Sequence, residues 1–143
     1  MSYLKGFFLL NVFLVFAWPS AASVSDEIQQ NHIFFKGGGA RLDQSARDQI
    51  VTLGSILNSS LMNGACLKLV GYADATDGAS VNRAISRSRA EAVAAALAEP
   101  LDDPSRVQET DGVGASGFLT EVPSIDPHQR RVAIFAKDCD RDG

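Results

Sequence analysis

An arginine stands in the apolar stripe of a predicted helix, and this feature limits how the chain can fold. Residues 80–98 are rich in alanine and are followed by Pro100, which predicts a helix. Four of its residues recur at intervals of four and therefore lie along one face: Ile85, Arg89, Val93 and Leu97. Because three of the four are apolar, this face should pack on the rest of the domain and carry Arg89 to the edge of the core.

The other segments predict a domain with two layers. Apolar spacing predicts another helix at residues 43–59, with Asp43 capping its start. Short apolar or alternating segments predict four strands, at residues 33–35, 66–72, 106–110 and 131–137. The order strand–helix–strand–helix–strand–strand (βαβαββ) predicts an α/β fold of the α+β type. This is a two-layer sandwich with the helices on one face of a mixed four-stranded sheet.

The first 22 residues have the pattern of a secretory signal peptide. Lys5 gives the start a positive charge, and an apolar segment follows at residues 6–18. Pro19 and a cluster of small residues come next, as expected for a cleavage region. An uncleaved membrane anchor is the alternative, but the apolar segment is shorter than the roughly 20 residues that a spanning helix needs.

Cleavage is expected after Ala22 or Ser23, which leaves a polar lead-in at residues 23–30 and one domain at residues 31–140. Export predicts a periplasmic location. One of the 13 basic residues, Lys5, lies in the signal peptide, so the mature chain has 12 basic against 17 acidic residues. This acidic balance argues against nucleic acid as a partner, because such binding depends on positive charge.

The sequence predicts neither a metal site nor catalytic residues, and no cofactor. His32 and His128 are far apart, and no Cys or Glu stands near them at metal-ligand spacing. An enzyme of the cell envelope would need a nucleophile–base pair or a metal centre, and neither pattern is visible.

Asp74 is the best candidate partner for Arg89. A guanidinium near the core costs several kcal/mol unless it is paired, and a carboxylate suits its fork of donors. Asp74 stands just past a predicted strand, close to where the chain turns into the helix that carries Arg89. Two interpretations stay open: a structural ion pair, or a clamp in which Asp74 holds the ammonium and Arg89 the carboxylate of one ligand.

The segment around these residues resembles the signature of the OmpA-like peptidoglycan-binding domains. The interval of 15 residues from Asp74 to Arg89 is the same as in that family. The matching positions of the signature are Gly71, Tyr72, Ala73, Asp74, Gly78, Asn82, Ile85, Ser86, Arg89 and Ala90. The resemblance extends over about residues 31–137, and its further matches are Ile33-Phe34-Phe35, Leu42, Gly112, Gly114 and Arg130-Arg131-Val132.

The resemblance implies an OmpA-like fold that binds peptidoglycan non-covalently in the envelope of a Gram-negative bacterium. Asp74 and Arg89 would hold the diaminopimelate of the stem peptide. The other ligand-binding positions that it implies are Asn82, Arg130, Tyr72 and Gly78. Such a domain would anchor or space the envelope, near the outer membrane and with outer-membrane or envelope-complex proteins as partners. The alternative is an interaction module of an envelope complex with weak or no peptidoglycan binding.

Three positions depart from the family pattern. Ala73 replaces the usual Thr and lacks its hydroxyl, Tyr72 replaces the common His, and Gln129 stands where Asn is usual. These changes are expected to affect the strength of binding or the preferred stem peptide, because they leave the charged residues in place.

Cys66 and Cys139 are expected to form a disulfide, because an exported protein meets an oxidising compartment. If the strands at 66–72 and 131–137 are antiparallel neighbours, the start of one lies beside the end of the other. The bond would then close a loop of about 70 residues and contribute about 4 kcal/mol in the chain-entropy model. The alternative is one buried and one exposed thiol.

Overall fold

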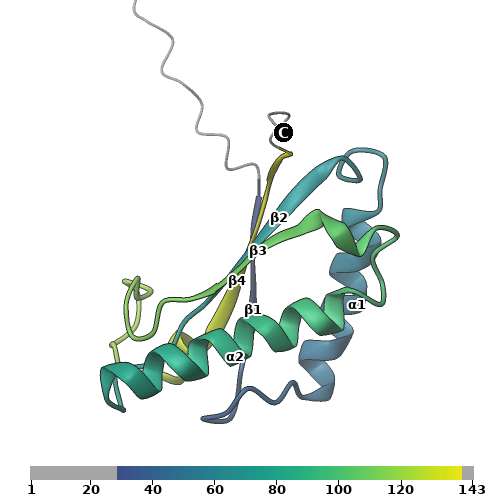
Figure 1. Ribbon diagram of the computed structural model, residues 1–143. Helices are drawn as coiled ribbons and strands as arrows, with labels where there is room; N and C mark the ends of the chain where they lie inside the picture. The colour runs from purple at the N-terminus through teal and green to yellow at the C-terminus, as the bar shows by residue number, and fades with distance from the viewer. Residues whose placement is uncertain (1–28, 140–143) are drawn as a thin grey trace, which may run out of the picture.

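Four strands and two helices build the domain, in the predicted order (Figure 1). The computed structural model describes residues 29–139, so the predicted signal peptide, most of the lead-in and the predicted end of the domain at residue 140 lie outside it. The strands are β1 (Gln29–Phe34), β2 (Ala65–Gly71), β3 (Val107–Gly112) and β4 (Arg131–Asp138). The helices are α1 (Gln44–Leu57) and α2 (Ala79–Leu97), with short 3₁₀ helices η1 (Pro104–Arg106) and η2 (Pro127–Gln129).

The sheet is mixed, as predicted. Its strand order is β1-β4-β2-β3, and β4 runs antiparallel to both of its neighbours. Strands β2 and β3 are parallel because α2 carries the chain back between them. The end of β2 and the start of β4 therefore lie side by side at one end of the sheet.

The hydrophobic core lies between one face of the sheet and the two helices. Leu67 and Leu69 alternate along β2 with residues of the other face, and both are fully buried. They pack in one cluster with the apolar stripes of the helices, which include Ile50 and Val93. Both helices lie on the same side of the sheet in Figure 1. The predicted two-layer arrangement is confirmed.

Strand β1 is longer than predicted. It begins at Gln29 rather than Ile33, although its first four residues are polar. Strand β1 pairs with β4 and stands at the edge of the sheet, where backbone hydrogen bonding does not require an apolar side chain on each face. The polar segment therefore gave no hydrophobic signal of a strand.

A glycine brings α2 unusually close to the sheet. A Cβ atom on Gly71 would lie 1.8 Å from the carbonyl oxygen of Ser86, so only glycine allows this approach. The Ser86 side chain is fully buried, and its Oγ accepts a hydrogen bond from the backbone N–H of Gly114 at 2.9 Å. These contacts fix the start of α2 against the ends of β2 and β3.

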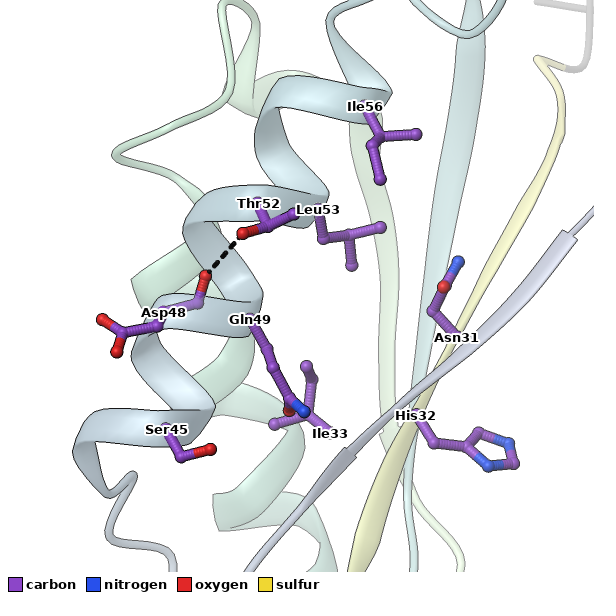
Figure 2. Close-up of a pocket in the computed structure, with 9 residues that line it drawn as sticks. All are labelled: Asn31, His32, Ile33, Ser45, Asp48, Gln49, Thr52, Leu53 and Ile56. Atoms are coloured by element: carbon purple, nitrogen blue, oxygen red, sulfur yellow. Dashed lines mark hydrogen bonds between the residues drawn. The ribbon is translucent and has the colours of Figure 1, made fainter.

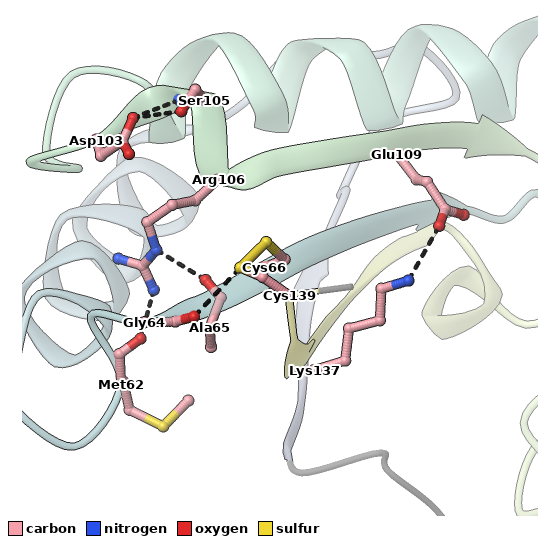
Figure 3. Close-up of a disulfide and its surroundings, with 10 residues drawn as sticks. All are labelled: Met62, Gly64, Ala65, Cys66, Asp103, Ser105, Arg106, Glu109, Lys137 and Cys139. Atoms are coloured by element: carbon pink, nitrogen blue, oxygen red, sulfur yellow. Dashed lines mark hydrogen bonds and ion pairs between the residues drawn. A yellow bond between two sulfur atoms is a disulfide. The ribbon is translucent and has the colours of Figure 1, made fainter. Parts of the chain in front are cut away.

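The predicted disulfide between Cys66 and Cys139 is present at the opposite end of β2 (Figure 3). Cys66 faces Lys137 in the antiparallel register, and the Cα atoms of the two cysteines are 4.8 Å apart.

Neither helix in residues 29–139 combines the length and the apolar character that a membrane crossing requires.

Candidate functional site

Asp74 lies three residues after the end of β2 and is 5% exposed. Its Oδ1 accepts hydrogen bonds from the backbone N–H of Thr76, at 3.3 Å, and from the Thr76 hydroxyl. Its Oδ2 pairs with Nη1 of Arg130 at 3.3 Å. Thr76 thus supplies a hydroxyl to this carboxylate although Ala73, where the family usually has Thr, has none.

Arg89 is held by backbone carbonyl groups. Its side chain is 1% exposed, as its place in the apolar stripe predicted. Nε donates to the carbonyl of Gly39 at 3.0 Å, Nη1 to that of Tyr72 at 3.0 Å, and Nη2 to that of Gly38 at 2.7 Å. The structural ion pair between Arg89 and Asp74, one of the two interpretations left open by the sequence, is therefore wrong, because carbonyls satisfy Arg89 and Arg130 pairs with Asp74.

Three charged groups nevertheless act on one another at this end of the sheet. Burial lowers the pKa of Arg89, and the positive charge of Arg130 lowers this pKa further. The negative charge of Asp74 acts in the opposite direction and raises the same pKa. Two guanidinium groups therefore lie close to one carboxylate.

Arg130 forms the more open side of this cluster. It stands between η2 and β4, and its side chain is 20% exposed. Its Nη2 donates to the carbonyl of Lys36 at 3.0 Å, while its Nε is buried without a hydrogen-bond partner among the described residues. The structure thus brings Arg130, predicted from the resemblance, into contact with Asp74.

Asn82 and Gly78 shape the loop between Asp74 and α2. Asn82 is 3% exposed, and its Nδ2 donates to the carbonyl of Asp77 at 2.8 Å. Its backbone N–H donates to the carbonyl of Gly78, the residue that precedes α2. Both residues hold the loop in place and thereby position Asp74.

Tyr72 contributes in two ways. Its carbonyl accepts a hydrogen bond from Arg89, and its ring stacks on the guanidinium of Arg131, 3.9 Å from the ring centroid. The Tyr72 side chain is therefore engaged with Arg131, which in turn donates to the carbonyl of Gly117 at 2.7 Å.

Gly38 and Gly39, which hold Arg89 through their carbonyls, were not among the predicted site residues. A Cβ atom on Gly38 or Gly39 would meet nothing within 4 Å, and neither residue has a positive φ. Neither packing nor backbone conformation within the described residues explains these glycines. The run of three glycines at residues 37–39 was the signal that could have identified them.

Gln129 has a role that the sequence did not reveal. It is fully buried, and its Oε1 accepts from the backbone N–H of Leu119 at 2.9 Å. Its Nε2 donates to the carbonyls of Leu119, Val122 and Pro123. This departure from the family pattern organises the loop between β3 and β4 and does not reach the charged cluster directly.

A groove of about 590 Å³ lies elsewhere, between β1 and α1. Figure 2 shows Leu53 and Ile56 of α1 directed toward β1. Its nine lining residues include none of the predicted site residues. Within residues 29–139, no group of His, Cys, Asp and Glu side chains is arranged to hold a metal ion.

The sequence matches the model of one known protein family. The model of the OmpA family matches residues 34–131. The OmpA-like domain of FopA1 from Francisella tularensis is 21% identical, with a TM-score of 0.66 over 78% of this chain and 75% of that one. The C-terminal domain of Helicobacter pylori MotB is 17% identical, with a TM-score of 0.66 over 78% of this chain and 88% of that one.

The peptidoglycan-associated lipoprotein of Burkholderia pseudomallei has a similar fold. It is 18% identical, with a TM-score of 0.55 over 73% of this chain and 87% of that one. A search of curated proteins finds no match. The family match covers more than two thirds of the sequence and includes every residue of the charged cluster. The chain belongs to the OmpA family.

Proposed function

We propose that this domain binds peptidoglycan non-covalently in the periplasm, through a diaminopimelate residue of the stem peptide. The observation that carries the proposal is the immobilised guanidinium of Arg89, 1% exposed and tied to three carbonyls close to Asp74. Membership of the OmpA family and the likeness to a protein named peptidoglycan-associated lipoprotein support it.

The arrangement suits a ligand group that carries both charges. A guanidinium has five N–H donors, and the carbonyls use three of those of Arg89. The other two suit a ligand carboxylate, because a charge-assisted bond to a fixed guanidinium is strong. Thr76 holds Oδ1 of Asp74, so Oδ2 is the oxygen that would receive a ligand ammonium.

The remaining predicted residues would act by positioning these two. Asn82 and Gly78 hold the loop that carries Asp74, and the carbonyl of Tyr72 holds Arg89. The proposed domain is a binding module, and we assign it no catalytic residue. Its role would be to anchor or space the cell envelope, near the outer membrane.

Co-sedimentation with purified peptidoglycan sacculi tests the proposal. The wild-type chain should enter the pellet, and Asp74→Asn should bind at least about tenfold more weakly, since a charged hydrogen bond contributes about 1.5–3 kcal/mol. Asp102→Asn is the matched control, because this carboxylate is exposed in the connection between α2 and β3. If Asp74→Asn and the wild type sediment equally, the assigned site is wrong.

The alternative is an interaction module of an envelope complex. The groove between β1 and α1 favours it, because this hollow is lined by residues that the charged cluster does not use. Its partner would be an envelope protein. Folded wild-type protein that stays in the supernatant with sacculi would refute peptidoglycan binding and leave this alternative.

A further inference from the structure

The charged cluster has more positive than negative charge. Arg89 and Arg130 both lie close to Asp74, and each guanidinium carries a full positive charge. Lys36 is also nearby, but its ammonium pairs with Asp43 at 2.7 Å, so this pair does not change the net charge of the cluster. A ligand group with one ammonium and one carboxylate would leave this net charge unchanged as well. The occupied site would keep one positive charge without a partner.

Arg130 is the group whose partner would change. Thr76 holds Oδ1 of Asp74, so a ligand ammonium would compete with Arg130 for Oδ2. The contact of Arg130 with Oδ2 is a single one at 3.3 Å, which is long for a charge-assisted bond. Its Nε is buried and has no hydrogen-bond partner within the described residues. Arg130 is thus incompletely satisfied even before a ligand arrives.

Accessibility also distinguishes the two arginines. The Arg130 side chain is 20% exposed, whereas Arg89 is 1% exposed and fixed by three carbonyls. Repulsion between them contributes to the lowered pKa of Arg89, so a further anion would relieve both. Arg130 can reach such an anion from the surface of the site.

We propose that Arg130 binds a second carboxylate of the ligand, so that the site selects a diamino-acid residue with another free carboxylate beside it. This inference rests on the proposed function. The ligand ammonium takes Oδ2 of Asp74, the first carboxylate takes the two remaining donors of Arg89, and the second carboxylate takes Arg130. The three charges of the protein and the three of the ligand are then paired.

The second carboxylate has two possible sources in a stem peptide. One is the carboxylate at the other end of the same diamino acid, which is free when the peptide stops there. The other is the carboxylate of the acidic residue that precedes the diamino acid. Conversion to an amide removes the charge at either place while the size of the group stays nearly the same.

Isothermal titration of the mature chain with four synthetic stem tripeptides separates these sources. One peptide has both of these carboxylates free, two have one of them amidated, and one has both amidated. Amidation at the correct place should weaken binding to the wild type about tenfold or more, as expected for loss of a charged hydrogen bond. The same amidation should change binding to Arg130→Gln less than about twofold, because this variant has already lost the guanidinium.

Arg83→Gln is the matched control, because Arg83 is exposed on α2, and it should keep the full effect of amidation. Arg130→Lys retains the charge and should keep part of this effect, which tests the proposal if Arg130→Gln fails to fold. Equal binding of all four peptides to the wild type, or an equal loss in Arg130→Gln, overturns the inference. Asp74→Asn still weakens binding at least about tenfold in that case if the proposed function itself is correct.

Discussion

Gly71→Ala should separate the helix that carries Arg89 from the sheet. The added Cβ would lie 1.8 Å from the carbonyl oxygen and 2.7 Å from the carbonyl carbon of Ser86. Both are backbone atoms of α2, so no change of rotamer relieves the clash. Ordinary contact between such atoms begins near 3.5 Å, and α2 would therefore have to move by about 1.7 Å.

Two effects should follow from this displacement. Overpacking of this kind costs about 1–3 kcal/mol of folding free energy. The hydrogen bond from Arg89 to the carbonyl of Tyr72 is 3.0 Å long, and a shift of about 1.7 Å would break it. Gly71→Ala should therefore lower both the free energy of unfolding and the binding of sacculi.

Urea unfolding of the protein measures the first effect, and co-sedimentation at a temperature where the variant is folded measures the second. Gly64→Ala is the control, because this glycine directly precedes β2 and a Cβ there would meet nothing within 4 Å. The reasoning is refuted if Gly71→Ala unfolds at the same urea concentration as Gly64→Ala with an unchanged slope.

Three further predictions concern parts of the fold away from Asp74. Replacing Cys66 and Cys139 by Ala should lower the free energy of unfolding by about 4 kcal/mol, because the bond closes a long loop, and urea titration checks this. Burial, and then the charge of Arg131, lowers the pKa of His32, so the folded state favours the neutral ring. Stability should therefore fall as the pH drops below the ordinary value of 6.5, and His32→Gln should reduce the fall in urea midpoint. Arg106 donates hydrogen bonds to the carbonyls of Leu57, Met62 and Ala65, and the ammonium of a lysine does not match this fork of donors. Arg106→Lys should therefore cost about 1–3 kcal/mol in the same assay yet leave sacculi binding intact.

Most of the fold could be predicted because apolar periodicity reports burial on one face. The stripe of α2 and the alternation along β2 both indicated residues that the structure buries, such as Val93 and Leu67. The polar first residues of the edge strand β1 have no apolar periodicity, so they were not predicted to form a strand. The disulfide was expected from the oxidising compartment on condition that β2 and β4 are antiparallel neighbours, and the structure shows both the pairing and the bond.

The site was predicted less completely. A sequence gives the type of each side chain, but it does not indicate which backbone carbonyls will lie close to a given residue. A search for the partner of Arg89 therefore considered carboxylates, whereas the structure supplies carbonyls of Gly38, Gly39 and Tyr72. The hydroxyl of Thr76 was missed for a related reason, since Thr76 lies three residues after position 73, where the family pattern usually has Thr. A sequence motif consists of side-chain types at fixed intervals. Contacts from backbone groups, or from a side chain at a different interval, therefore cannot be recognised as part of a motif.

A comparison with Arg106 shows why a buried arginine does not by itself mark a site. Its guanidinium, near the disulfide in Figure 3, also donates to three carbonyls, those of Leu57, Met62 and Ala65. There the arginine ties the end of α1 and the following loop to β2, and none of its hydrogen bonds goes to a carboxylate. Arg89 has the same kind of support but stands beside Asp74 and a second, more exposed guanidinium. Carbonyls therefore make the burial of either charge possible, and the neighbouring charges make one of the two arginines a candidate for binding.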